Sequence, residues 1–370
     1  MKIDDNLSIS KQKIALVLPS NIRYAPFYRK YEDILVKNDI PFDLIYWNRE
    51  NIIEDISGTL HSYSLKDRVN SKNYLKIIKY FGFARYVKKK LEREKYNKVI
   101  FLGSNAGTVA LLSSHLAKKF KDQYWLDIRD YTYEYFGIYY KYMETAIKNS
   151  FATAISSEGY KIFLPKHDYI NVHNIDINSI EASLEKRSTI IDEITLPIRI
   201  SFIGLVRYYE ENKRLIKALG NDSRFLIQYF GQNSDVLKKY CEENNIRNVN
   251  FVGRFEPCET AEFYSKTDII NNIYGNNGLA VTTALSNKLY FAAALNIPIL
   301  VSPNTYMDEI TKQYSFGYSV DFDANNLADE LFLWYERYRN NNKNQNKLLW
   351  SKAIEENKEF ESKFMEFISF

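Results

Sequence analysis

Apolar, strand-like runs alternate with amphipathic helical segments twice along this chain, once in each half. The first series opens at residues 13–20 (KIALVLPS) and the second at residues 198–204 (IRISFIG). Mostly apolar runs of this length are typical of strands buried on both faces, and strands that alternate with helices form βαβ units with parallel sheets. The pattern therefore predicts an α/β chain of two doubly wound halves in series.

The other predicted elements follow the same alternation. Further strands are predicted at 42–47, 98–103, 123–130, 224–231, 249–255, 269–275 and 317–323, with helices at 73–95, at 104–120 and from about residue 324 onwards. Residues 51–72 and 177–197 lack a strong periodic pattern, so we interpret the first as a loop and the second as an interdomain region that docks to neither half. We expect an N-terminal domain at 1–178, a C-terminal domain at 196–349 and a helix at about 350–370 that packs back on the N-terminal domain.

Composition excludes several classes of function. The 370 residues include 50 basic and 46 acidic side chains, a balance that argues against nucleic acid as a partner. Two cysteines without CxxC spacing and four scattered histidines indicate neither a disulfide framework nor a zinc site. The N-terminal residues lack the apolar core of a signal peptide, and no run of about 18 apolar residues is present. We expect a cytoplasmic protein.

Basic and small polar residues follow the predicted strands of the second half. Ligands of open α/β sheets bind at the carboxyl ends of the strands, where helix N-termini also attract anions. The candidates for an anion such as a diphosphate are Arg207, Lys213, Arg254, Phe255, Ser286, Asn287 and Lys288. Plainer interpretations stay open for each group: a solvated basic face, a β-turn at 253–255, and an N-cap supplied by Ser286.

The first half offers candidates at the same kind of position. Ser20, Asn21, Asn105, Asp127, Arg129 and Asp130 all follow predicted strands. A carboxylate such as Asp130 could take a proton from an acceptor hydroxyl. The alternative for Asp127, Arg129 and Asp130 is an Asp–Arg ion pair that only holds the loop. His173 is interpreted as a hydrogen-bonded structural residue.

The second half resembles the donor-binding domain of GT-B-fold glycosyltransferases. The segments that carry the resemblance are FIGLVR (202–207), VNFVGRF (249–255) with AEFYSKTDI (261–269), and SNKLYFAAALNIPILVS (286–302). In the first half, LDIRDYTYEYF (126–136) and ISSEGY (155–160) resemble the acceptor side of bacterial capsule and exopolysaccharide glycosyltransferases. The resemblance covers nearly the whole chain and is strongest at about 198–325.

This resemblance implies a GT-B fold, with two facing Rossmann-like domains and a cleft between them. It implies a hexosyltransferase that moves a sugar from a nucleotide diphosphate-sugar, UDP-sugar favoured, to a glycan acceptor on a lipid carrier. Arg207, Asn287 and Lys288 would hold the diphosphate, the residues near 253–255 would contact the base, and Ser20 and Asn21 would lie near the phosphates. Asp127, Arg129 and Asn105 would face the acceptor. The resemblance implies neither a metal nor another cofactor, because the nucleotide-sugar is a substrate.

One position departs from the family pattern. Many retaining members carry two glutamates in an E-x7-E arrangement, the second of which binds the donor ribose. Here these positions fall near Thr283 and on Phe291. Phe291 resembles a subgroup that includes galactofuranosyl- and some glucosyltransferases, with an apolar residue at this position.

Two alternatives remain beside the transferase, and one motif offers a rival metal-binding interpretation. The loss of the ribose glutamate supports a non-catalytic GT-B-like subunit that stabilises a partner transferase. A sugar-nucleotide epimerase would use a similar scaffold without an acceptor. Asp321 and Asp323 form the D-x-D pattern of metal-dependent GT-A enzymes, but their place before ANNLADEL favours a strand end followed by a helix cap.

Residues 72–95 form a basic run that is interleaved with apolar side chains. They include nine Lys or Arg and two Glu, together with Leu75, Ile77, Ile78, Tyr80, Phe81 and Phe83. A basic amphipathic helix of this kind suits an anionic membrane surface, and a core-packed helix with a solvated basic face is the equal alternative. The first interpretation predicts peripheral attachment to the inner face of the cell membrane. A homo-oligomer is also left open.

Overall fold

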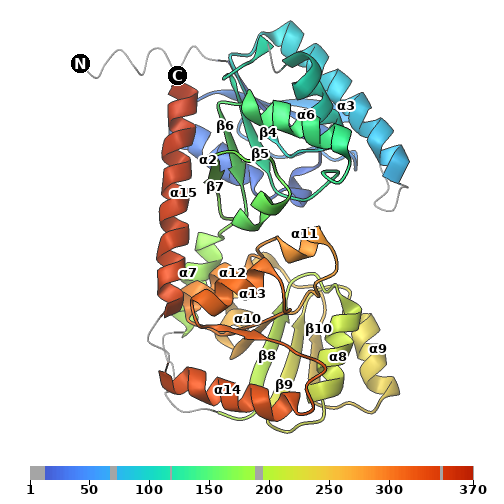
Figure 1. The fold of residues 1–370 in the computed structure, drawn as a ribbon, viewed down its shortest axis with the longest axis vertical. Coiled ribbons are helices and arrows are strands. Elements are labelled where there is room, and N and C mark those ends of the chain that lie inside the picture. Colours follow the sequence, from blue (N-terminus) through green and yellow to red (C-terminus); the bar gives the residue numbers. More distant parts are fainter. Residues whose placement is uncertain (1–12, 67–72, 117–118, 188–194, 342–344, 370) are drawn as a thin grey trace, which may run out of the picture. The chain divides into compact units, whose positions relative to one another are not determined.

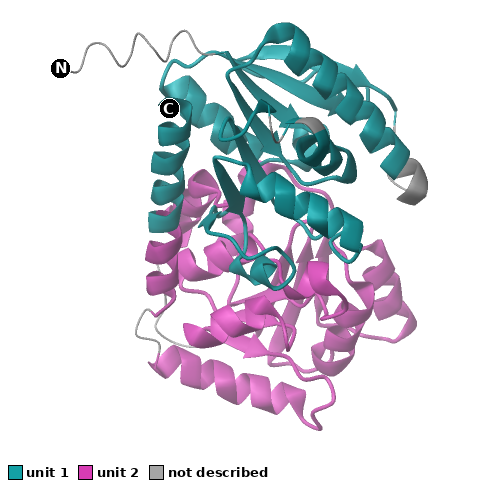
Figure 2. Cartoon of the chain, turned by 45° about the horizontal axis from the view of Figure 1, so that its top comes forward, with its two compact units in different colours: residues 1–173, 355–370 teal, residues 174–354 magenta. Residues whose placement is uncertain are grey.

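The computed structural model describes residues 13–66, 73–116, 119–187, 195–341 and 345–369. The chain divides into two compact units, residues 1–173 with 355–370 (unit 1) and residues 174–354 (unit 2) (Figure 2). Each unit is a parallel sheet covered by helices, so the predicted α/β class with two Rossmann-like halves is confirmed.

Unit 1 contains a seven-stranded sheet in the order β3-β2-β1-β4-β5-β6-β7. Its strands are β1 (Ile14–Leu18), β2 (Phe42–Asn48), β3 (Thr59–Ser64), β4 (Lys98–Leu102), β5 (Tyr124–Ile128), β6 (Ala152–Ile155) and β7 (Tyr169–Asn171). The strand order reverses between β1 and β4. In such sheets this switch point, at the carboxyl ends of the strands, is the usual place for a ligand.

Helices cover both faces of the unit 1 sheet (Figure 1). On one face lie α2 (Tyr28–Lys37) and the C-terminal half of α15 (Gln345–Ser369), which meet where Phe364 packs edge-on to Tyr31 with 5.1 Å between ring centroids. On the other lie α3 (Asn73–Glu94), α4 (Ala106–Leu111) and α6 (Gly137–Lys148). Phe360, Phe364 and Phe367 of α15 are fully buried in this core, because the final turns of the chain fill the face beside α2.

Unit 2 contains a six-stranded sheet in the order β10-β9-β8-β11-β12-β13. The strands are β8 (Ile198–Ile203), β9 (Phe225–Phe230), β10 (Val249–Val252), β11 (Ile269–Asn272), β12 (Ile299–Val301) and β13 (Gly317–Ser319). The order reverses between β8 and β11, so the switch point of this unit lies at their carboxyl ends.

The helices of unit 2 also form two layers, each with its own apolar cluster. One layer holds α8 (Tyr209–Leu219), α9 (Asp235–Glu243) and α14 (Leu327–Asn341). The other holds α7 (Ile177–Arg187), α10 (Thr260–Ser265), α12 (Lys288–Leu295) and α13 (Tyr306–Gln313). The short helix α11 (Leu279–Thr282) lies in the loop before α12.

Two predictions about segments are wrong. Within 51–72, residues 59–64 form the edge strand β3, which pairs with β2 although its sequence is polar. None of the six residues of β3 is buried, so this strand carries no apolar signature. Within 177–197, Ile177–Arg187 form α7, whose Ile180 is buried in unit 2, and the Arg187 guanidinium donates to the backbone oxygen of Thr267 at 2.8 Å. Residues 67–72 and 188–194 lie outside the described residues.

Candidate functional site

Helix α12 places a lysine at the switch point of unit 2. The helix begins at Lys288, after Asn287 as the preceding cap residue, and ends at Leu295. Asn296 follows in the left-handed conformation that closes helices. All eight residues of the helix are buried, as expected for an almost wholly apolar sequence. The Lys288 backbone N–H donates to the Ser286 hydroxyl at 3.2 Å. Ser286 therefore supports the start of the helix.

The Lys288 side chain reaches across the carboxyl ends of β8 and β11. Its ammonium donates a hydrogen bond of 2.9 Å to the Tyr274 hydroxyl and lies 4.0 Å from the ring centroid of Phe202. Lys288 is 7% exposed, so its charge is stabilised mainly by this hydroxyl and by aromatic faces. The result is a positive charge fixed beside a helix N-terminus, which is a suitable environment for an anion.

Tyr274 accepts a hydrogen bond from one cationic side chain, Lys288, and stacks on a second tyrosine. Its ring stacks on Tyr208 with centroids 4.5 Å apart and an angle of 21° between the planes. Burial alone would raise the pKa of the Tyr274 phenol, but the charge of Lys288, hydrogen bonds from Lys288 and Ser286, and the charge of Arg207 lower it below its ordinary value. The lowered pKa indicates a strongly positive environment at this edge of the sheet.

A buried amide network fixes the turn that carries Arg207 and Tyr208. The Asn212 amide nitrogen donates to the backbone oxygens of both residues at 3.1 and 3.0 Å. The Asn212 amide oxygen accepts from the Tyr229 hydroxyl at 2.9 Å and from the Asn271 amide at 3.0 Å. Because Asn271 lies in β11, the network connects the β8–α8 turn to the strand that leads to Tyr274.

The structure brings three of the predicted donor-site residues together. Arg207, Ser286 and Lys288 all interact with Tyr274, and Arg207 and the adjacent Asn287 are exposed. Lys213 instead pairs with Glu210 at 2.9 Å on α8.

Arg254 and Phe255 follow β10 at the edge of the sheet. Arg254 is exposed, and Phe255 packs edge-on against Phe263 with centroids 5.0 Å apart. No hydrogen bond connects either residue to the Lys288–Tyr274 pair among the residues that the structure describes.

The position of the family glutamate is filled by an aromatic stack. Phe291 lies parallel to Tyr264, with ring centroids 3.9 Å apart and an angle of 3° between planes. Both rings are buried. Phe291 therefore stabilises the packing of α12 on α10 and offers no acceptor to a ribose hydroxyl.

Asp127 and Arg129 of unit 1 form a buried ion pair. The Asp127 carboxylate is fully buried and accepts from the Tyr31 hydroxyl at 2.6 Å and from the Arg129 guanidinium at 2.6 and 2.7 Å. Arg129 also lies 4.4 Å from the Phe27 ring centroid. These contacts agree with the alternative given for Asp127 and Arg129 in the sequence analysis, an ion pair that holds the loop after β5.

Asp130 has a different environment from its two neighbours. Its side chain is exposed. Partial loss of hydration raises the pKa of the Asp130 carboxyl, and the charge of Arg129 opposes this shift. A carboxylate with a raised pKa at a strand end is a reasonable proton acceptor.

The amide residues at the switch point of unit 1 have structural contacts. Asn21 is fully buried, and its amide donates to Glu54 at 2.8 Å and to Asn48 at 3.1 Å. Asn105 caps α4 by accepting from the backbone N–H groups of its first turn at 3.1 Å. The hydroxyl of Ser20 donates to the neighbouring backbone oxygen of Asn21 at 3.1 Å.

The D-x-D pair shows no arrangement for a cation. Asp323 pairs with Arg214 at 3.1 Å, and the Asp321 carboxylate accepts from the Asp323 backbone N–H at 2.9 Å. Across the described parts of the chain, no group of three His, Cys, Asp or Glu residues is placed to hold a metal ion. In the same residues, no helix is both long enough and apolar enough to cross a membrane.

Comparisons with known proteins identify the fold. No protein-family model and no curated protein matches the sequence. Sucrose-phosphate synthase from Thermosynechococcus elongatus matches in structure with a TM-score of 0.65 and 12% identity, over 96% of this chain and all of that one. The Anabaena protein HepE, solved with UDP, matches with a TM-score of 0.60 and 10% identity, over 96% of this chain and all of that one.

This chain has the GT-B fold. The fold is not confined to transferases among the similar structures. The UDP-GlcNAc 2-epimerase of Neisseria meningitidis, solved with UDP-GlcNAc, matches with a TM-score of 0.53 and 14% identity, over 93% of this chain and all of that one.

Sequence reasoning missed the aromatic part of the unit 2 site. Phe202, Tyr208 and Tyr274 lie in or after strands, where aromatic residues are usually assigned to the core. The buried Asn212 gave no signal either, because a single Asn in a helix is unremarkable in sequence. Only the three-dimensional structure of this GT-B chain places these side chains around Lys288.

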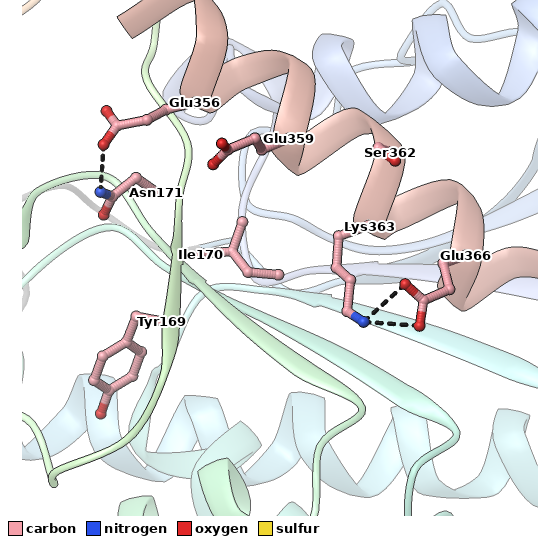
Figure 3. Close-up of a pocket in the computed structure, with 8 residues that line it drawn as sticks. All are labelled: Tyr169, Ile170, Asn171, Glu356, Glu359, Ser362, Lys363 and Glu366. Carbon is pink, nitrogen blue, oxygen red and sulfur yellow. Dashed lines mark hydrogen bonds and ion pairs between the residues drawn. The ribbon is translucent and has the colours of Figure 1, made fainter. Parts of the chain in front are cut away.

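A pocket of about 400 Å³ in unit 1 lies between β7 and α15 (Figure 3). It is lined by Tyr169, Ile170, Asn171, Glu356, Glu359, Ser362, Lys363 and Glu366. Lys363 donates to both carboxylate oxygens of Glu366, and Asn171 donates to Glu356 at 2.9 Å. None of the predicted donor-site or acceptor-side residues lines this pocket.

Proposed function

We propose that this chain is a glycosyltransferase that uses a nucleotide diphosphate-sugar, with UDP-sugar as the favoured donor. The observation that carries the proposal is the Lys288 ammonium, fixed beside the N-terminus of α12 and near Arg207 at the switch point of unit 2. A nucleoside diphosphate carries its negative charge on adjacent phosphates, and such a cation–helix arrangement suits it.

The proposed reaction needs charge stabilisation and a proton acceptor. The bond between the anomeric carbon and the diphosphate oxygen breaks, and Lys288, Arg207 and the helix N-terminus stabilise the diphosphate that leaves. A bond forms between that carbon and an acceptor hydroxyl oxygen, whose proton passes to Asp130, the proposed base. The proposal involves no metal, because fixed cations and helix dipoles supply the positive charge.

We further propose an acceptor on a lipid carrier at an anionic membrane surface, as in surface polysaccharide biosynthesis. The support comes from α3, whose Ile78 and Phe81 are 65% and 49% exposed while Phe83, Val87 and Leu91 are buried. Tyr135, Phe136 and Ile138, at the start of α6, are also exposed. Apolar side chains on a basic helix are the feature expected of a peripheral membrane contact.

Two alternatives have an observation in their favour. The Phe291–Tyr264 stack at the position of the ribose glutamate favours a non-catalytic partner subunit. The fold shared with a UDP-GlcNAc 2-epimerase favours isomerisation of the donor itself.

Incubation of the purified chain with a panel of UDP-sugars, with and without a membrane extract as acceptor, separates these alternatives. We expect UDP to be released, faster with the acceptor, and Lys288→Met to abolish the release while Lys312→Met does not. Conversion of the sugar with its UDP still attached identifies an epimerase. If neither UDP nor a changed sugar is formed, the transferase proposal is wrong and the partner-subunit alternative gains support.

A further inference from the structure

We propose that Tyr274 is a positioning residue that directs the Lys288 ammonium toward a nucleoside diphosphate bound at unit 2, and that its ionisation weakens this binding. The inference rests on the proposed function of the same site. The notable feature is that a buried lysine at the candidate anion site is held by a phenol. Among the described residues, the Tyr274 hydroxyl is the hydrogen-bond acceptor of the Lys288 ammonium, at 2.9 Å.

The phenol restricts where the ammonium can lie. A lysine side chain has a flexible four-carbon stem and an ammonium with three N–H donors, so an unrestrained side chain would sample many positions. Here the stem is buried, the ammonium lies 4.0 Å from the Phe202 ring centroid, and one donor is directed to Tyr274. The hydrogen bond thus selects one position of the charge beside the helix N-terminus.

Tyr274 is itself held from the other side. Its ring stacks on Tyr208 at 4.5 Å, and Tyr208 has a left-handed backbone with φ of 57°. The Asn212 amide donates to the backbone oxygen of Tyr208 at 3.0 Å and so secures this turn. A rigid chain of contacts therefore runs from the buried amide network through Tyr208 and Tyr274 to the ammonium.

Several charged or titratable groups surround Tyr274. Lys288 of α12 and Arg207 of the β8–α8 turn are the cations, and the Tyr208 phenol stacks on its ring. The Tyr264 phenol of α10 also interacts with it electrostatically. The Glu211 carboxylate of α8 lies at the adjacent Gly275, 3.1 Å from the position that a Cβ would occupy there. The two cations lower the pKa of the Tyr274 phenol against the effect of burial.

This arrangement couples the protonation of Tyr274 to anion binding. While the phenol is neutral, the positive charges of Lys288 and Arg207 are available to the phosphates. When the phenol loses its proton, the phenolate neutralises one of these charges, so the diphosphate is held less strongly. Because the pKa is lowered from 10.0, the loss of affinity begins at a lower pH than an ordinary tyrosine would give.

The test is calorimetric binding of UDP, GDP and dTDP from pH 7 to 9.5 on the full chain, Tyr274→Phe and Tyr318→Phe. Tyr274→Phe keeps the ring and removes the hydroxyl that accepts from Lys288. Tyr318→Phe is the matched control, because Tyr318 lies in β13 and packs on Trp334 instead, and it should bind as wild type does. At pH 7 we expect Tyr274→Phe to weaken binding roughly tenfold, since a hydrogen bond to a charged group is lost. Wild-type affinity should fall as the pH rises, whereas the Tyr274→Phe affinity should stay nearly constant.

The outcomes separate the inference from the proposed function. If wild type and Tyr274→Phe bind with equal affinity and the same pH profile, the positioning role is overturned and the transferase proposal stands. If wild type binds none of the three nucleotides, the transferase proposal and the positioning role both fail. A separate measurement, without any nucleotide, tests whether the charge of Lys288 shifts the ionisation of the Tyr274 phenol. It is the ultraviolet difference titration of wild type minus Tyr274→Phe. The inference is supported if the Tyr274 phenol ionises below pH 10 in wild type and at a higher pH in Lys288→Met. It is contradicted if Lys288→Met leaves the ionisation of the phenol unchanged.

Discussion

Lys30 lies near the buried Asp127–Arg129 pair, and its charge is poorly stabilised by the fold. Its ammonium donates to the backbone oxygen of His173 at 2.7 Å. Burial, reinforced by the charge of Arg129, lowers the pKa of Lys30 from 10.5 to about 7, while Asp127 and Glu361 oppose the shift. At the scale of single residues, this lysine should therefore affect the stability of unit 1 in a pH-dependent way.

Between pH 7 and pH 10.5 the unfolded chain keeps the Lys30 proton while the folded chain releases it. The unfolded state thus binds more protons, so rising pH through this window favours the folded state. We expect the unfolding free energy of wild type relative to Lys30→Met to increase from pH 7 to 10, by at most about 1.4 kcal/mol per pH unit. Urea unfolding of both proteins at several pH values measures this difference. A difference in unfolding free energy that stays constant from pH 7 to 10 would contradict the prediction.

At the scale of elements, α15 contributes large aromatic side chains to unit 1. Phe364 is fully buried and packs edge-on to Tyr31 and to Trp125, with ring centroids 5.1 and 5.4 Å apart. The Tyr31 hydroxyl in turn donates to Asp127 at 2.6 Å. The helix therefore supports both the core and the buried ion pair.

Phe364→Ala should destabilise unit 1 by about 3–5 kcal/mol, because it removes a buried ring and leaves a cavity. Leu348→Ala is the matched control in the same helix, since Leu348 is 64% exposed and surface changes usually alter stability by less than about 0.5 kcal/mol. Chemical unfolding followed by tryptophan fluorescence measures both. Equal effects of the two substitutions would show that α15 does not stabilise the core in this way.

The elements also show what the sequence could predict. Apolar strands such as Ile14–Leu18 and the long α3 follow from periodicity, because burial on both faces or on one face leaves a pattern. The edge strand Thr59–Ser64 was missed because it is polar. Lys288 was found through a motif at a helix start, whereas Tyr274 was missed because contacts between a strand end and a distant helix leave no local signal.

At the scale of the whole molecule, unit 1 presents the surface proposed for a membrane. Ile78 and Phe81 project from α3, along which Arg85 and Lys89 are also exposed. Unit 2 has an exposed apolar side chain as well, Leu333 of α14, without such a basic run. Attraction to an anionic surface should thus depend on α3 and should decrease with salt.

The full chain should bind vesicles that contain phosphatidylglycerol at low ionic strength and bind neutral vesicles weakly. We expect the double substitution Ile78→Ser and Phe81→Ser to reduce binding severalfold, because the buried apolar area is lost. Leu333→Ser should leave it unchanged. Vesicle flotation measures this, and equal retention on neutral and anionic vesicles, or none on either, would refute the membrane proposal.

The most direct test of the central claim is calorimetric binding of UDP, GDP, dTDP and CMP, without metal, to wild type, Lys288→Met and Lys312→Met. Lys288→Met keeps the packing on Phe202 and removes the charge. We predict that one nucleoside diphosphate binds, stabilising the chain by about 2.7 kcal/mol at one hundred times its dissociation constant, and that only Lys288→Met loses this binding. Absence of binding by wild type, or undiminished binding by Lys288→Met, would contradict the account of a diphosphate site at the switch point of unit 2.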